Sequence, residues 1–155
     1  KDGVSALLRV AELAAILRAE GRTLTDQLDD IARVYGLHAT DQLSVRVTDL
    51  SQIADAMAQL RAAPPASLGG LAVEQVDDLT EGGAGLPPTE GLRYRLAEGA
   101  RVVVRPSGTE PKLKCYLEVV VPVEEGEEGG VDAARIAAVG RLDAIRTDLS
   151  KAAGL

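Results

Sequence analysis

Residues 101–121 read RVVVRPSGTEPKLKCYLEVVV. Two runs rich in β-branched residues flank a short segment of proline, glycine and polar residues, which predicts a strand, a loop and a second strand. The loop contains the donors that a small anion requires: Arg105 carries a planar guanidinium that suits phosphate oxygens, and Ser107 and Thr109 carry hydroxyl groups. Gly108 lacks a Cβ, so we expect the backbone to turn there with a positive φ and to bring its N–H groups toward an anion.

The same residue types also have an ordinary structural role. Serine and threonine hydroxyl groups often bond their own backbone in turns, and Gly108 can serve simply as a turn glycine. The two roles are compatible, because an anion-binding nest is a turn whose N–H groups converge. Glu110 is unexpected beside an anion, and we expect it either to brace Arg105 or the loop backbone, or to face water.

The loop region is basic, although the chain is acidic. The 155 residues include 17 basic and 24 acidic residues, which gives a formal net charge of −7. Residues 101–114 contain four basic residues and a single glutamate, a local charge of +3. A compact basic region on an acidic protein favours a small anionic ligand, whereas nucleic acid or a membrane surface would require a wide basic face. We therefore expect neither nucleic acid nor a membrane as a partner.

Helical periodicity marks both ends of the chain. The spacing of apolar residues predicts a first helix over residues 3–20 and a second that is capped by Thr23 or Thr25 and ends at Gly36. A final helix is expected from Val131 to Gly154. We expect the apolar faces of the first two helices to pack on a sheet that this chain lacks. The alternative is a self-contained helical hairpin docked on the following domain.

The middle of the chain reads as strands. Alternation predicts strands at residues 43–47, 71–76 and 92–96, in addition to the two that flank the basic loop. A further helix over about residues 53–63 precedes the prolines at 64 and 65. Residues 77–91 and 124–130, rich in glycine with proline or acidic residues, read as loops. The predicted fold class is α+β: an antiparallel sheet of about four strands with helices packed on one face, preceded by the two helices.

Composition supports a packed domain. Hydrophobic residues make up 46% of the chain, and no apolar run approaches the ~20 residues that span a bilayer. The single cysteine, Cys115, falls on the apolar side of its strand and is predicted to be a core residue rather than a nucleophile. One cysteine cannot form an intramolecular disulfide, which favours a reducing compartment, and we expect a cytoplasmic protein. The chain starts at Lys1 within a helical pattern, so we expect it to be a piece of a longer protein.

The run RPSGTEPKLKCYLEV, residues 105–119, resembles the phosphate-binding loop of the α-D-phosphohexomutases, the phosphomannomutase/phosphoglucomutase family. The resemblance covers the whole chain: residues 1–40 resemble the helical end of that family's third domain, and residues 41–155 its fourth, phosphate-binding domain. It implies a parent enzyme that interconverts hexose 1-phosphate and hexose 6-phosphate through a phosphoserine and a bisphosphate intermediate. The partners implied are a hexose phosphate and the remaining domains of the parent.

The resemblance also assigns roles within the loop. It implies that Arg105, Ser107, Gly108 and Thr109 bind the phosphate of the substrate and that this chain supplies no catalytic residue. In some family members a basic residue just beyond the loop reaches the phosphate too, and Lys114 occupies that place. An outward-facing strand lysine is the ordinary alternative, and both interpretations remain open.

Other parts of the family's machinery are missing from this sequence. The family's phosphorylated serine loop and its Asp-Gly-Asp-x-Asp metal loop belong to the first and second domains, and neither motif occurs here. We therefore expect Mg²⁺ to bind in a domain absent from this chain, no cofactor to bind here, and no mutase activity from the chain alone. The resemblance is also compatible with an activator of the glucose 1,6-bisphosphate type for the parent enzyme.

A second class of function remains as an alternative: a non-enzymatic anion-binding or protein-interaction module. A sheet with helices on one face also occurs in nucleic-acid binders. However, the net charge of −7, the single basic region and an aromatic content of 2% argue against that kind of partner, because stacking platforms for bases require aromatic residues.

Overall fold

The computed structural model describes residues 2–82, 87–124 and 130–154. Within them the chain forms helices, strands and two short 3₁₀ turns in the order α1 (Gly3–Ala19), α2 (Leu24–Tyr35), β1 (Leu37–Arg46), α3 (Ser51–Ala62), β2 (Ser67–Leu68), β3 (Leu71–Asp78), η1 (Leu79–Glu81), β4 (Leu92–Leu96), η2 (Ala97–Gly99), β5 (Arg101–Pro106), β6 (Lys112–Val121) and α4 (Val131–Ala152).

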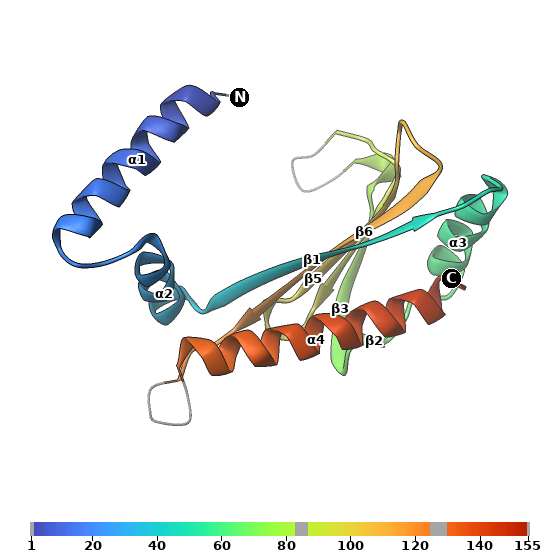
Figure 1. Ribbon diagram of the computed structural model, residues 1–155. Coiled ribbons are helices and arrows are strands. Elements are labelled where there is room, and N and C mark those ends of the chain that lie inside the picture. The colour runs from blue at the N-terminus through green and yellow to red at the C-terminus, as the bar shows by residue number, and fades with distance from the viewer. Residues whose placement is uncertain (1, 83–86, 125–129, 155) are drawn as a thin grey trace.

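The strands form one antiparallel sheet in the order β1-β6-β5-β4-β3-β2. In Figure 1, α4 runs along one face of this sheet, and α3 lies near the C-terminal end of α4. Alternate residues of β5 and β6, such as Val102 and Leu117, are buried on the face that packs against the helices. The other face carries exposed or partly exposed side chains, so it is this face that can meet a ligand.

The α+β class with helices on one face is confirmed, but the sheet has six strands rather than about four. Five of the six strands overlap segments expected as strands, and β2 is the additional one. β1 is also longer than the expected strand. β1 pairs with β6 over ten residues, from Leu37 to Arg46, although its first half is too polar to show a clear alternation. β2 has only two residues, too few for any periodicity, and the Gly69-Gly70 turn pairs it with β3. A Gly-Gly pair between two strands is a hairpin signal that the sequence already contained.

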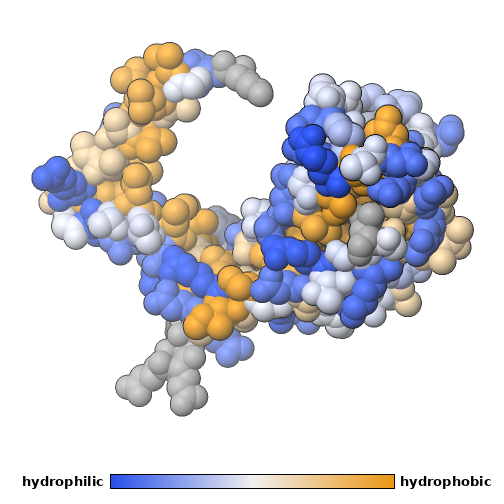
Figure 2. All heavy atoms as spheres, turned by 45° about the vertical axis from the view of Figure 1, so that its right-hand side comes forward, coloured by the Kyte–Doolittle hydropathy of each residue, from blue (hydrophilic) through white to orange (hydrophobic). Residues whose placement is uncertain are grey.

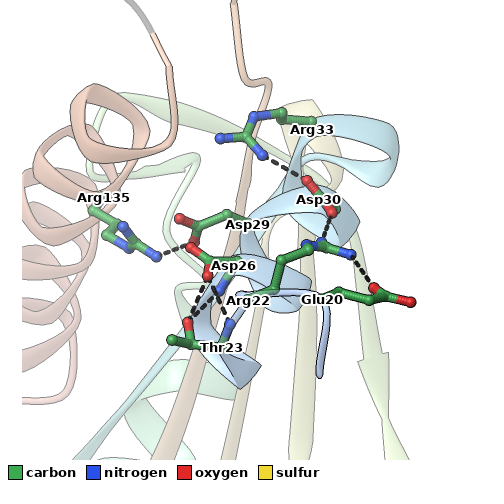
Figure 3. Close-up of polar contacts among 8 residues, drawn as sticks. All are labelled: Glu20, Arg22, Thr23, Asp26, Asp29, Asp30, Arg33 and Arg135. Carbon is green, nitrogen blue, oxygen red and sulfur yellow. Dashed lines mark hydrogen bonds and ion pairs between the residues drawn. The ribbon is translucent and has the colours of Figure 1, made fainter. Parts of the chain in front are cut away.

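The N-terminal helices match their expected bounds. The N-cap of α2 is Thr23, whose hydroxyl accepts from the N–H of Asp26 while the Asp26 carboxylate accepts from the N–H of Thr23. Figure 3 shows this capping box, together with an ion pair between Asp29 of α2 and Arg135 of α4. Buried Ala32 also lies on α2. The second helix is therefore docked on the strand-containing part of the chain.

The first helix is different, because it stands away from the sheet (Figure 1). Most of its large apolar residues are exposed, namely Val4, Leu7, Leu8, Val10, Leu13 and Ile16, whereas Leu17 near its end is buried. Figure 2 shows an arc rich in apolar residues that projects from the body of the molecule. A self-contained hairpin docked on the following domain therefore does not describe α1. The expected boundary after residue 40 falls inside β1, and the assignment of residues 1–40 to a third domain stays a prediction.

The connections were predicted in outline. β3 extends to Asp78, and η1 follows it, so the segment expected as one long loop from residue 77 begins with regular structure. The turn between β4 and β5 is η2, where Glu98 has a φ of 58°. Residues 83–86 of the expected loop and residues 125–129 of the expected acidic linker lie outside the described residues.

An ion-pair cluster links α3 to the end of β3. The Nε of Arg61 donates to Asp78 Oδ2 at 2.8 Å, and Nη2 of Arg61 donates to Glu90 Oε1 at 2.6 Å. The hydrogen bond from Arg61 is the main reason that the pKa of the Asp78 carboxyl falls to about 2 from its ordinary value of 3.8. The Arg61–Asp78 bond is therefore present at neutral pH, where it connects α3 to the end of β3. Glu90, the second partner of Arg61, lies just before β4.

This lowered pKa predicts a pH dependence of stability. Because the pKa of Asp78 is lower in the folded than in the unfolded state, its contribution is present above about pH 4 and is lost as the pH falls toward 2. Asp78→Asn keeps an oxygen that can cap Thr80 but removes the charge. We expect this variant to be less stable than the unmodified chain at pH 6 in urea unfolding, with the gap closing between about pH 4 and pH 2.

A matched control is Asp55→Asn, on the exposed side of α3, where no ion pair or hydrogen bond of the carboxylate is seen among the described residues. This variant should follow the unmodified chain at every pH. A difference in stability between Asp78→Asn and the unmodified chain that stays constant from pH 6 to pH 2 would contradict the role given to the Arg61–Asp78 bond.

Candidate functional site

The basic loop joins β5 and β6 at one end of the sheet, as the sequence predicted. Strand β5 ends at Pro106 and β6 begins at Lys112. The N–H of Ser107 donates to the carbonyl of Lys112 at 2.9 Å and closes the base of the loop. The N–H of Lys112 donates to the carbonyl of Glu110 at 2.7 Å, which tightens its second half.

The backbone at Gly108 differs from the expectation. Its φ lies outside the left-handed region, whereas eight other glycines of the described chain have a positive φ. A Cβ at this position would meet no atom within 4 Å. The prediction of a positive φ at Gly108 is therefore wrong for this structure, because the turn is closed by the Ser107–Lys112 bond without a left-handed residue. Gly108 and Thr109 form the exposed tip of the loop.

Arg105 and Lys114 lie side by side on the uncovered face of the sheet. They are register partners in the β5–β6 pair, so their side chains leave the sheet on the same side. Among the described residues neither side chain forms an ion pair or a hydrogen bond. Every other described lysine or arginine except Arg18 does form an ion pair.

Two hollows border the loop, one on each face of the sheet. The larger, of about 670 Å³, lies over the uncovered face and is lined by Arg105 together with Thr40, Gln42, Arg101 and Tyr116. The smaller, of about 330 Å³, lies between the loop and α3 and is lined by Pro106, Ser107, Met57 and Arg61, among others. The predicted residues thus gather at one end of the sheet. Arg105 borders the larger hollow and Ser107 the smaller one, whereas Gly108, Thr109 and Lys114 line neither.

The two remaining basic residues of the region have acidic partners. Arg101 pairs with Glu118 on the neighbouring strand, and Lys112 Nζ lies 2.9 Å from Glu110 Oε1. Glu110 also accepts from Nη2 of Arg46 at 3.2 Å. The hydrogen bond from Lys112, with the nearby charges of Arg46 and Lys114, lowers the pKa of the Glu110 carboxyl. Of the alternatives for Glu110, the structure shows bracing of the loop, through the side chains of Lys112 and Arg46 and not through Arg105.

Sequence reasoning missed Arg46. The alternation in residues 43–47 placed it on the polar side of a strand, but nothing in that pattern tells which strand pairs with which. Only the β1–β6 register, with Arg46 opposite Lys112, brings its guanidinium to the loop. The same register adds Thr40 and Gln42 to the floor of the larger hollow.

Cys115 is a core residue, as predicted. Its side chain is buried in the apolar cluster, and burial raises the pKa of the thiol to about 12, so it is a thiol and not a thiolate at neutral pH. Within residues 2–82, 87–124 and 130–154, no three His, Cys, Asp or Glu side chains lie together in a way that could hold a metal ion. No helix in the same ranges combines the length and apolarity needed to cross a bilayer.

Comparison with known protein families gives one match that spans more than half of the chain. Residues 43–136 match a family model described as the C-terminal domain of phosphoglucomutase/phosphomannomutase. The matched range includes β1 from Leu43 onward, the basic loop and the first part of α4.

Similar sequences and structures carry related names. The chain is 39% identical over 118 residues to a probable phosphomannomutase of Haemophilus influenzae, covering 76% of this chain and 24% of that protein. It is 33% identical over 138 residues to a phosphopentomutase of Mus musculus, covering 79% and 22%. A solved structure of parafusin, a phosphoglucomutase from Paramecium, in its open form superposes with a TM-score of 0.61 at 17% identity, covering 100% of this chain and 28% of that one. This chain spans about a quarter of the length of these relatives.

Proposed function

The chain belongs to the phosphoglucomutase/phosphomannomutase family, of which it carries the C-terminal domain, and from this we propose that it binds the phosphate of a sugar phosphate substrate at the 105–114 region. The residues proposed to make the contacts are Arg105, Ser107, Gly108, Thr109 and Lys114. The first and last supply charge, and the others supply hydroxyl and backbone donors at the loop tip.

One observation carries this proposal: Arg105 and Lys114 are cross-strand neighbours of like charge, and neither has an ion pair among the described residues. Like charges directly opposite in a sheet are destabilising, so such a pair needs a compensating group. A phosphate dianion placed between them would supply two negative charges and oxygen acceptors for both. A guanidinium fork and an ammonium group are the two cations that proteins use most for phosphate.

In the parent enzyme we assign this chain to the phosphate that is not reacting. The parent would interconvert hexose 1-phosphate and hexose 6-phosphate through a phosphoserine and a bisphosphate intermediate, and a grip on the distal phosphate would orient the substrate at the reacting centre. A loop that recognises only phosphate geometry can accept either end of the intermediate after it turns around. The name phosphopentomutase among the relatives is compatible with such a loop, because the loop leaves the choice of sugar to other parts.

The remaining parts of the proposal lie outside this chain. Other domains of the parent would contain the phosphoserine and would bind Mg²⁺ and any activator of the glucose 1,6-bisphosphate type. The same domains would be the partners that this chain contacts. The parent would be a cytoplasmic enzyme, and the chain alone would have no mutase activity. The competing anion-binding or interaction module would use the same loop without a parent enzyme.

The test is a titration of the isotope-labelled chain with inorganic phosphate, followed by nuclear magnetic resonance. We expect saturable shifts of the Ser107, Gly108 and Thr109 amides and of the Arg105 side chain, with weak affinity because the other walls of the parent's active site are absent. Absence of shifts at these groups at the highest phosphate concentrations would contradict the proposal. Shifts that spread evenly over the basic residues would indicate an unspecific charge effect and would contradict it as well.

A further inference from the structure

We propose that Glu110 and Arg46 are positioning residues for the phosphate-binding loop: their ion pair fixes the loop against β1 before the anion arrives. This inference rests on the proposed function of the loop. It assigns a role to an acidic residue whose presence in an anion site is otherwise unfavourable, and to an arginine that lies more than fifty residues away in the sequence.

The contacts hold the second half of the loop at three points. Oε1 of Glu110 accepts from Nη2 of Arg46 at 3.2 Å and from Nζ of Lys112 at 2.9 Å. The N–H of Val47, just after β1, donates to the carbonyl of Pro111 at 3.0 Å. β1 and β6 are thus connected to the loop by both side-chain and backbone bonds. The first half of the loop, Ser107 to Thr109, has one such bond, from the Ser107 N–H to Lys112.

The charges divide in the same way. Of the basic side chains around the loop, Arg46 and Lys112 contact Glu110, whereas Arg105 and Lys114 have no ion pair among the described residues. Glu110 therefore uses two cations to set the shape of the loop and leaves two for the ligand. It also lines the smaller hollow beside Ser107.

Two physical effects of the Glu110 carboxylate on phosphate binding have opposite signs. Its negative charge repels a phosphate dianion, so through the field alone Glu110 weakens binding. Its bonds order the loop in advance, which lowers the entropy lost on binding and so strengthens it. The proposal states that the second effect is larger, which makes the sign of the change in affinity a direct test.

The experiment uses the whole 155-residue chain with inorganic phosphate as the probe. We expect Glu110→Gln to weaken phosphate binding about two- to fivefold, the range for loss of an exposed ion pair, and to speed amide hydrogen exchange at Ser107, Gly108 and Thr109. Arg46→Gln should have the same two effects, and Arg46→Lys should restore most of both. In the double variant the losses should not add, because each single change already breaks the same bond.

The matched control is Glu118→Gln. It removes a carboxylate from β6, where Glu118 pairs with Arg101, but it breaks no bond to the loop. It should not weaken phosphate binding, and loop exchange should stay unchanged. Tighter phosphate binding in Glu110→Gln with unchanged exchange would overturn the inference, because Glu110 would then act only through its field. The inference would also be overturned if Glu110→Gln and Arg46→Gln changed the phosphate affinity in opposite directions and the two changes added in the double variant.

The proposed phosphate binding and the positioning role of Glu110 can fail separately. If the unmodified chain shows no phosphate shifts at the loop, the proposed function fails and this inference fails with it. If phosphate binds at the loop but Glu110→Gln binds it more tightly, only the positioning role fails. The amide exchange of each variant without phosphate reports the loop's order independently of any ligand, and a dispersed spectrum shows that the variant is folded.

Discussion

Arg105→Ala is expected to weaken phosphate binding by about 10- to 150-fold, which corresponds to roughly 1.5–3 kcal/mol for a charge-assisted hydrogen bond. The guanidinium lies on the uncovered face of the sheet beside Lys114, at the border of the larger hollow, and contacts no acidic residue among those described. Its removal would therefore delete the proposed phosphate contact and break no described ion pair. The measurement is the phosphate titration of this chain, and kcat/KM of the parent enzyme should fall by a similar factor.

The neighbouring Arg101 is the matched control, because it lies on the same face of β5 but pairs with Glu118. Arg101→Ala should weaken phosphate binding far less than Arg105→Ala. Equal losses in the two variants would mean that the region binds anions through its general field and not through Arg105. Lys114→Ala decides the alternative that the sequence left open: a loss close to that of Arg105→Ala indicates a phosphate contact, and an unchanged affinity indicates an ordinary strand lysine.

Gly69→Ala is expected to lower the free energy of unfolding by about 2–5 kcal/mol. Gly69 has a φ of +58°, and a Cβ there would lie 2.7 Å from Cγ1 and 2.9 Å from the backbone N of Ile145 in α4. Since Ile145 is fully buried, α4 would have to move away from the β2–β3 hairpin. The estimate combines about 1–2 kcal/mol for an L residue in the left-handed region with about 1–3 kcal/mol for overpacking.

The next residue separates these two costs. Gly70 has a φ of +78°, but a Cβ there would meet nothing within 4 Å. Gly70→Ala should therefore cost only the conformational part, about 1–2 kcal/mol. Both variants are compared with the unmodified chain by urea unfolding at neutral pH. Equal destabilisation by the two changes would show that the close approach of the hairpin to α4 does not limit this position.

Much of the local structure could be predicted from the sequence because its causes are local. The threonine cap before α2, the glycine that ends α2 and the alternation in the last strand each depend on residues a few positions apart. The strand–loop–strand arrangement around residues 105–112 follows from the same kind of pattern, as does the burial of Cys115. Expectations that concerned pairing partners were weaker: the two-residue β2 and the polar half of β1 were not foreseen.

The candidate site shows the same division. The residues proposed for it come from the sequence, since an arginine followed by two hydroxyl residues and a glycine between two prolines forms a chemically recognisable set. Their surroundings could not. The conformation of Gly108, the ion pair that Glu110 forms with Arg46, and the separation of Arg105 and Ser107 onto two hollows depend on chain packing in three dimensions.

The sequence by itself determined that this chain is an α+β domain with a basic loop between two strands on an otherwise acidic protein. It did so because strand alternation, helix capping and local charge are properties of neighbouring residues. Only the tertiary structure decided that β1 pairs with β6, that Arg46 reaches the loop, and that Arg105 and Lys114 stand side by side with no ion pair among the described residues. Such contacts depend on strand register, which is set by the packing of the whole sheet against α3 and α4 and is not encoded in any short segment.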